Sequence, residues 1–221
     1  MYRKLVANIR KQISEYRKSG KKLFATSSFQ THSLPMLHIL SEIDNSIPVY
    51  FTHTGFLFPE TLIFKDEIAR QFHLNIIAVH PQTPKLFQRD KNGQFLYTSD
   101  PDYCCYLNKV QPLEPVLAEF DIWINGIRAD QNENRKQMKT EQPAPFNSLR
   151  YHPMLQWTSK MIYQYISDHK LPAHPLEKQG YLSIGCEPCT IKFLEGGNER
   201  NARWFGMNKT ECGLHTELIK K

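Results

Sequence analysis

The chain has 221 residues, of which 40% are hydrophobic and 12% aromatic, and these ordinary values indicate a globular protein with one sizeable core. No apolar run approaches the roughly 20 residues of a membrane span, and the basic N-terminus lacks the apolar core of a signal peptide, so we expect a cytoplasmic protein with no membrane partner. The formal charge of +6 favours an anionic partner, but the basic residues form no long run, and we do not expect nucleic acid.

Helices and strands are predicted to alternate along most of the chain. In chain order, the predicted elements are a helix at residues 1–20, a strand at 22–27, a helix at 34–43, a strand at 48–54, a helix at 59–72, a strand at 74–80, a helix at 112–120, a strand at 122–127 and a helix at 158–169. Gly20 ends the first helix, and Ser33 is expected to cap the second. Residues 131–147 are predicted to be a loop, and residues 81–102 and those from 171 onward carry no regular pattern. This alternation predicts an α/β fold with a mainly parallel sheet and helices on both faces.

The predicted strands end in polar residues, at the edge where parallel sheets bind ligands. The first strand leads into a segment that carries the hydroxyls of Ser27, Ser28, Thr31 and Ser33. Hydroxyls beside the N-terminus of a helix favour an anion, although the glycines and the lysine of a P-loop are absent. The segment is therefore interpreted either as an anion site or as a polar turn that caps a helix. The later strands end at His53-Thr54-Gly55, His80 and Gly126-Ile127-Arg128.

Four of the five cysteines form two tight groups, Cys104-Cys105 and Cys186-Glu-Pro-Cys189. In a reducing compartment such groups indicate metal binding or catalysis before disulfides. Adjacent cysteines rarely share one zinc ion, whereas a four-iron, four-sulfur cluster binds each thiolate at a separate iron. The four cysteines are therefore predicted to ligate a 4Fe–4S cluster. Structural cysteines with an unrelated CxxC, or a redox-active CxxC pair, are the alternatives.

The fifth cysteine, Cys212, is predicted to be a nucleophile. It lies between Lys209 and His215, and positive charge on these residues would lower the pKa of its thiol, whereas Glu211 would raise it. Gly213 gives the segment conformational freedom. A surface cysteine on a C-terminal tail is the alternative.

Several basic residues are candidates for pairing with a phosphate or sulfate group. Together with the hydroxyl segment, the candidate substrate-binding residues are Ser27, Ser28, Thr31, Ser33, Lys109, Arg128, Arg200, Arg203 and His215. Lys109 follows Cys105 by four residues and could also offset the negative charge of a cluster. For any single basic residue, a solvated surface charge is the alternative. Trp204 could dock the C-terminal segment or stack on an adenine, while Trp123 and Trp157 are expected in the core.

Several segments, in order along the chain, carry family motifs. They are Thr54-Gly-Phe-Leu-Phe-Pro-Glu-Thr61, Cys104-Cys105-Tyr-Leu-Asn-Lys109-Val-Gln-Pro-Leu-Glu114, Trp123-Ile-Asn-Gly126-Ile-Arg128-Ala-Asp130-Gln131, Gln179-Gly-Tyr-Leu-Ser-Ile-Gly-Cys-Glu-Pro-Cys189-Thr190, Arg200-Asn-Ala-Arg203-Trp204 and Lys209-Thr-Glu-Cys-Gly-Leu-His215. Together they resemble the assimilatory adenylyl-sulfate and phosphoadenylyl-sulfate reductases, within the adenine-nucleotide α-hydrolase-like superfamily. Several ordered motifs are far more specific than any one of them.

The resemblance implies a reductase of sulfate assimilation and cysteine biosynthesis that depends on thioredoxin or glutaredoxin. It implies that Cys212 attacks the sulfur of adenylyl sulfate, or of phosphoadenylyl sulfate, and carries an S-sulfonate that the reductant releases as sulfite. Family members with the four further cysteines carry a 4Fe–4S cluster and mostly use adenylyl sulfate, so that substrate is favoured here. Residues 1–195 are expected to form the nucleotide-binding domain and residues 196–221 a C-terminal redox segment, and the oligomeric state stays open.

The chain departs from the family pattern in three places. His53 stands where the family has Asp before Thr-Gly, and Lys178 or Glu177 stands where the family has His. The hydroxyl segment, Ser27 to Ser33, has no Asp before its last Ser. The first departure puts the nucleotide contact at that strand end in doubt. Two other functions stay open on the residues alone. One is an ATP pyrophosphatase of the same superfamily, although its glycine-rich loop is absent, and the other is a non-enzymatic metal-binding module.

Overall fold

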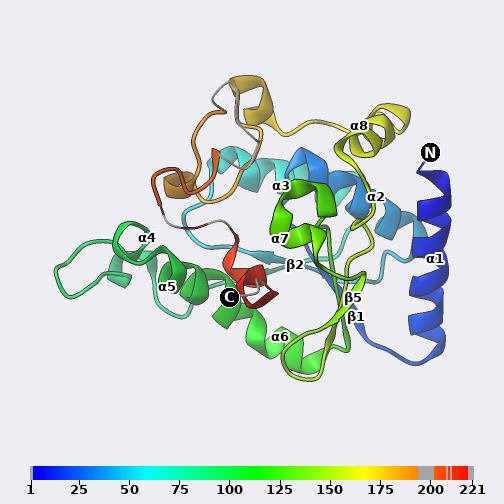
Figure 1. Cartoon of the computed structure of the whole chain (residues 1–221), viewed down its shortest axis with the longest axis horizontal. Helices are drawn as coiled ribbons and strands as arrows, with labels where there is room; N and C mark the ends of the chain where they lie inside the picture. Colours follow the sequence, from blue (N-terminus) through cyan, green and yellow to red (C-terminus); the bar gives the residue numbers. More distant parts are fainter. Residues whose placement is uncertain (1, 194–201, 208, 210, 219–221) are drawn as a thin grey trace.

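A mainly parallel sheet forms the centre of the computed structural model, which describes residues 2–193, 202–207, 209 and 211–218 (Figure 1). Its strands are β1 (Leu23–Thr26), β2 (Val49–Thr52), β3 (Ile76–Val79), β4 (Ile122–Asn125), β5 (Glu141–Pro143) and β6 (Leu149–Tyr151). They lie in the order β3-β2-β1-β4-β6-β5, and every neighbouring pair is parallel except β5 with β6. The predicted α/β fold is confirmed. None of the described helices is long and apolar enough to cross a membrane.

Helices cover both faces of the sheet. They are α1 (Arg3–Lys18), α2 (Leu34–Ile43), α3 (Pro59–Gln71), α4 (Leu96–Ser99), α5 (Pro101–Cys105), α6 (Glu114–Glu119), α7 (Glu133–Lys136) and α8 (Ser159–Asp168). One core packs α1, α2, α3 and α8 against side chains such as Ala25 and Ile124. The other core packs α6 against Phe24 and Trp123, which are the strand neighbours of those residues. Because successive strand residues point to opposite faces, the buried runs of β1 and β4 serve both cores.

Most predicted elements are confirmed within one to three residues, and α2 has the predicted bounds. The cap prediction for Ser33 is wrong. Residues Thr31–Ser33 form a single 3-10 turn that continues into α2, so Ser33 has helical backbone angles (φ −86°, ψ −19°) and its side chain caps nothing. A side chain caps a helix from an extended backbone, as Thr158 does for α8 by accepting from the Met161 N–H.

The loop prediction for residues 131–147 is also wrong, since this range contains α7 and β5, and β6 follows it unpredicted. The Asn132 side chain starts α7 by accepting the Arg135 N–H at 2.8 Å. β5 and β6 are only three residues each, too short for an alternating pattern to be visible.

The segment between β3 and β4 extends from the sheet as an arm that includes α4 and α5 (Figure 1). After α5 the chain makes one π-helical turn, Tyr106–Val110, before it reaches α6. Such turns are rare and are frequent at functional sites. The C-terminal 3-10 helix, Gly213–Leu218, packs against this turn and against α5, which brings the C-terminal segment to the sheet.

Candidate active site

A cavity of about 470 Å³ opens where β1, β2 and β4 end, as expected for a parallel sheet. Residues from these strand ends, from α7, from residues 182–186 and from the C-terminal segment line it. His53 and His80 are not among the lining residues, and instead stack on each other with their ring centroids 4.8 Å apart. The departure at His53 therefore lies outside the described wall of the cavity.

The hydroxyl segment after β1 contributes three of its four predicted residues to the cavity. Ser27, Ser28 and Ser33 line it, at the start of the helical stretch that leads into α2. Thr31 does not, because it is buried and its hydroxyl bonds to the Glu177 carboxylate and accepts the His174 N–H at 2.9 Å. Thr31 thus fastens the segment to residues 174–177 and does not line the described cavity.

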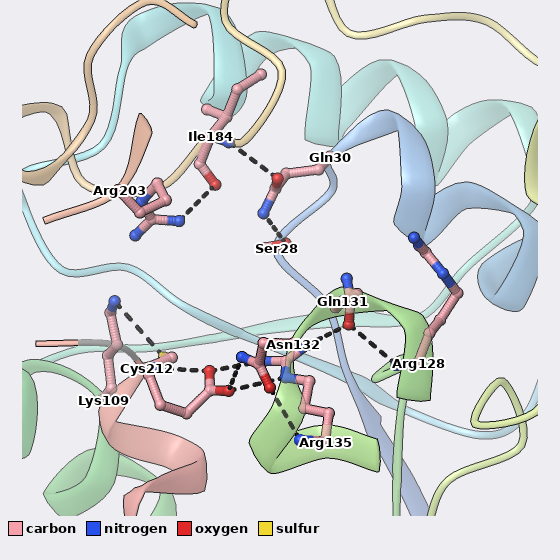
Figure 2. A network of polar contacts seen from close by, with 11 residues as sticks. Ser28, Gln30, Lys109, Arg128, Gln131, Asn132, Arg135, Ile184, Arg203 and Cys212 are labelled. Carbon is pink, nitrogen blue, oxygen red and sulfur yellow. Dashed lines mark hydrogen bonds and ion pairs between the residues drawn. The ribbon is translucent and has the colours of Figure 1, made fainter. Parts of the chain in front are cut away.

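Gln30 holds the same segment in place from the other side. Its side-chain amide donates to the Ser28 hydroxyl at 3.1 Å, and its carbonyl accepts the Ile184 N–H at 2.9 Å (Figure 2). Gln30 therefore ties the hydroxyl segment to the residues just before Cys186. The sequence patterns did not single it out.

Asn125 is a second lining residue that no motif argument selected. Asn125 is the last residue of β4 and is 2% exposed. Neither its amide nitrogen nor its amide oxygen has a hydrogen-bond partner in the described part of the chain. A buried amide without partners is costly, and such groups in native structures call for a ligand or water. Asn125 therefore offers the cavity both a donor and an acceptor.

Two of the predicted arginines line the cavity. Arg128 is buried, pairs with Asp130 at 2.9 Å and donates to the Ser159 hydroxyl at 3.0 Å. Arg203 donates to the backbone carbonyls of Cys189 and Ile184. Arg200, the third predicted arginine, lies outside the described residues.

Gly185 is the residue that makes room for Arg203. A Cβ at Gly185 would lie 2.1 Å from the Arg203 guanidinium, so only glycine allows this close approach. Arg203 also stacks on Trp204, with its guanidinium carbon 4.7 Å from the ring centroid. Trp204 is thus a buried neighbour of the site, and Trp123 and Trp157 are buried in the core as predicted.

The Cys212 thiol is half-buried at the cavity, 3.8 Å from the Lys109 ammonium (Figure 2). Burial raises the pKa of the thiol, but Lys109 and the Leu214 backbone N–H lower it, and the net direction is below the ordinary value. Burial likewise opposes the charge of Lys109, yet the thiols of Cys186, Cys212 and Cys105 raise its pKa. Lys109 is therefore an ammonium that favours the thiolate form of Cys212.

The two cations expected from the sequence do not act as predicted. His215 is buried and stacks on Trp123 at 5.9 Å between ring centroids, and burial lowers its pKa well below the ordinary value. A neutral imidazole cannot lower the pKa of Cys212. Lys209 pairs with the Asp102 carboxylate on α5. Lys109, which is 103 residues away along the chain, supplies the charge instead.

Glu211 is held by a buried ion pair that sequence reasoning did not find. Arg135 of α7 contacts both carboxylate oxygens, from Nη2 at 2.7 Å and from Nε at 2.8 Å. Glu211 still raises the pKa of Cys212, and the positive charge of Arg135 opposes this effect.

The four remaining cysteines are buried, and none of the five, all of which are described, forms a disulfide. Burial raises the pKa of Cys104 to about 12, and the charges of Cys105, Cys186 and Cys189 add to this rise. The four thiols are thus close enough to interact, although they come from two distant segments. Asn108 and Thr54 approach two of them, with Asn108 Nδ2 3.5 Å from Cys104 Sγ and Thr54 Oγ1 3.3 Å from Cys186 Sγ.

The donor set consists of four buried thiols from two separate segments of the chain. Among the described residues, no three His, Cys, Asp or Glu side chains converge on one metal position. A structural zinc ion requires four ligand atoms around one point, whereas a four-iron cluster takes each thiolate on a different iron. Buried thiols with raised pKa values are unfavourable as free thiolates, and metal binding would remove that cost.

Comparison with known proteins gives consistent matches. The family model of the phosphoadenosine phosphosulfate reductase domain matches residues 22–192. The adenosine 5′-phosphosulfate reductase of Bacillus cytotoxicus is 37% identical over 204 residues, which cover 91% of this chain and 87% of the relative.

Solved structures support the same fold. A phosphoadenylyl-sulfate reductase from Candida auris, in a phosphate complex, superposes with a TM-score of 0.66 at 20% identity, over 86% of this chain and 98% of that one. A tRNA thiolase from Methanococcus maripaludis with its 4Fe–4S cluster has a TM-score of 0.52 at 15% identity, over 70% and 59% of the two chains. At these identities the superpositions concern the fold.

Proposed function

The chain belongs to the phosphoadenosine phosphosulfate reductase family, and we propose that it reduces adenylyl sulfate to sulfite, with Cys212 as the nucleophile. The observation that carries the proposal is the half-buried thiol at the substrate-sized cavity, 3.8 Å from a buried ammonium. A neighbouring ammonium favours the thiolate, which is the nucleophilic form of cysteine. The names of the relatives favour adenylyl sulfate, and phosphoadenylyl sulfate is the second substrate to test.

We assign the anionic part of the substrate to the hydroxyl segment and the arginines. Ser27, Ser28 and Ser33 surround the start of the helical stretch that leads into α2, and the positive end of a helix favours phosphate or sulfate oxygens. Arg203 and Arg128 also line the cavity and add positive charge, and Figure 2 shows them on either side of Ser28. The substrate is then held between these groups, with its sulfuryl end toward Cys212.

In the first step the Cys212 thiolate attacks the sulfuryl sulfur. A sulfur–sulfur bond forms while the bond from sulfur to the phosphate oxygen breaks, and adenosine monophosphate leaves with the electron pair. The enzyme then carries a cysteine S-sulfonate. Lys109 stabilises the thiolate before attack, and the arginines stabilise the charge that develops on the leaving phosphate.

In the second step a dithiol reductant, thioredoxin or glutaredoxin, attacks Cys212 Sγ. A mixed disulfide forms, sulfite leaves with the electron pair, and the second thiol of the reductant frees Cys212 as a thiol. Half-burial limits access of a protein reductant to Cys212. We therefore propose that residues 196–221 act as a segment separate from residues 1–195, closed for the first step and open for the second.

Cys104, Cys105, Cys186 and Cys189 are the residues that would hold a 4Fe–4S cluster. When bound, it would supply iron to four buried thiolates that burial alone disfavours. The chain itself provides the surrounding contacts, since Asn108 and Thr54 lie against the sulfurs and Lys109 faces both this group and Cys212.

Sulfite production tests the proposal. Protein purified without oxygen should release sulfite from adenylyl sulfate when thioredoxin and its reductant are present, and faster than from phosphoadenylyl sulfate. Cys212→Ser should abolish sulfite release and leave bound iron unchanged. Activity near wild type in this variant would remove Cys212 from the mechanism, and a preference for the phosphorylated substrate would overturn the assignment of adenylyl sulfate.

A further inference from the structure

The ion pair between Glu211 and Arg135 joins the segment that carries the nucleophile to the body of the protein. The Glu211 side chain is 0% exposed and that of Arg135 is 6% exposed. One carboxylate oxygen accepts from Arg135 Nη2 at 2.7 Å and from the Cys212 backbone N–H at 2.8 Å. The other accepts from Arg135 Nε at 2.8 Å and from Asn132 Nδ2 at 3.2 Å. One carboxylate thus bonds both to α7 and to the backbone of Cys212.

The partner side of this contact is itself fixed. Asn132 caps α7 through the Arg135 N–H, and Gln131 accepts hydrogen bonds from both the Arg135 guanidinium and the Arg128 N–H. Figure 2 shows Asn132 and Arg135 on one side of Cys212 and Lys109 on the other. Contacts of Glu211 with α7 therefore define the position of Cys212, while Lys109 favours the thiolate form of its side chain.

The other contacts of the segment include the stack of His215 on Trp123, and packing contacts of this kind restrain direction less than paired hydrogen bonds do. Leu214 packs partly buried against the core beneath α6, and Gly213 lies against Cys105. The ion pair of Lys209 joins a side chain that is 4% exposed to an Asp102 carboxylate that is 72% exposed, and solvent around the carboxylate weakens the pair. A buried bidentate pair imposes a strict geometry, because each oxygen has a required partner.

The same pair is suited to reversible opening. Water hydrates both ions when they separate, so the net stability of a buried pair is small even though its geometry is strict. Removal of one partner has a much larger effect, because the remaining charge would be buried without compensation in the closed arrangement. A contact of this kind can hold the segment in one position without binding it permanently.

We propose that Arg135 and Asn132 are positioning residues that hold Cys212 over the cavity by binding Glu211, and that separation of Glu211 from Arg135 exposes Cys212 to the reductant. The first half, the positioning role, needs only the structure. The second half, the opening step, rests on the function proposed above. Neither residue is required to touch the reacting sulfur.

Hydrogen exchange tests the first half directly. In the iron-containing protein, Glu211→Gln and Arg135→Met should increase the exchange rate of backbone amides in residues 211–215 on the order of 100-fold, because loss of one charge favours the open segment. Peptides from β1 and β4 should exchange as in the wild type. Glu133→Gln is the matched control, since Glu133 lies on the same helix in an exposed pair with Lys136.

The two half-reactions test the second half. Formation of the Cys212 S-sulfonate from adenylyl sulfate without reductant should slow on the order of 100-fold in both variants, with the substrate KM kept within about twofold. Release of sulfite from preformed S-sulfonate by thioredoxin should be as fast as in the wild type, or faster. A general structural defect would slow both half-reactions.

Unchanged exchange at residues 211–215 in both variants would overturn the positioning role. Slowing of both half-reactions would overturn the opening step. If Arg135→Met fails to fold, Arg135→Lys and Glu211→Asp replace it, because each keeps the charge but loses the bidentate geometry. An absence of S-sulfonate on the wild type would refute the proposed function and would leave the exchange result to decide the positioning role.

Discussion

Replacement of Lys109 by Met removes the cation that faces the nucleophile. With 3.8 Å between Lys109 Nζ and Cys212 Sγ, the Coulomb attraction is about 4 kcal/mol at an effective dielectric constant of about 20, or about 3 pKa units. Arg203 also lowers the pKa of Cys212 and would remain, so the expected rise is about one to three units. A raised pKa means less thiolate at neutral pH, by roughly 10-fold to 1000-fold.

The assay is the rate at which iodoacetamide alkylates Cys212, followed by mass spectrometry of the C-terminal peptide from pH 6 to about pH 10. In Lys109→Met the rate at neutral pH should fall, and it should recover as the pH rises through the new pKa. Lys109→Arg keeps the positive charge and is the control, with a midpoint close to that of the wild type.

An alkylation midpoint that does not move in Lys109→Met would refute this reasoning. It would mean that the charge controlling Cys212 comes from elsewhere, for example from Arg203. A midpoint that moves to lower pH would have the wrong sign for loss of a cation and would refute it as well.

Three further predictions concern the packing and the ligands of the site. Gly213→Ala places a Cβ 2.8 Å from Cys105 Cβ, so the segment must shift, and S-sulfonate formation should slow by at least about tenfold in a single-turnover assay; a wild-type rate would contradict the close packing. Cys186→Ser should lower the iron content per chain below that of a full cluster, which is about four, and an unchanged iron content would remove Cys186 as a ligand. Asn125→Ala removes an amide that has no partner among the described residues, so it should raise KM by about tenfold while Tm does not fall; a Tm lower by several degrees would show that the amide stabilises the fold.

The sequence was sufficient for the features that depend on short stretches of chain. The bounds of α2 followed from an apolar periodicity with Pro35 in the first turn, and the place of the cavity followed from the rule that parallel sheets bind ligands at the carboxyl ends of their strands. The hydroxyl segment after β1 was found in the same way. The roles of the individual residues in this segment could not be predicted, because the sequence does not reveal that the Thr31 side chain points away from the cavity toward Glu177.

Burial accounts for the error at His215. Close spacing to Cys212 suggested a protonated neighbour, and an exposed imidazole with an ordinary pKa would be partly charged near neutral pH. In the structure the ring stacks on Trp123 and its pKa is lowered by burial, so it is neutral. Neighbours in the sequence thus indicated the right kind of charge but the wrong residue.

Contacts between distant residues explain what else was missed. Arg135 and Glu211 are 76 residues apart, and Arg135 lies in a range predicted to be a loop, so no pattern connected them. The pairing exists because a four-residue helix, α7, forms after β4 and turns Arg135 toward the C-terminal segment. β5 and β6 follow this helix and return the chain to the sheet. Both strands are too short to show a strand pattern in the sequence.

Lys109 lies near both the Cys212 thiol and the group of four buried cysteines, which are far apart in the sequence. It follows Cys105 within one π-helical turn, and the thiols of Cys186 and Cys105, as well as Cys212, raise its pKa. One buried ammonium therefore lies near both Cys212 and the four-cysteine group. A four-cysteine group with less negative charge repels the Cys212 thiolate less, so a change in the occupancy of those cysteines that lowers their negative charge should move the alkylation midpoint of Cys212 to lower pH.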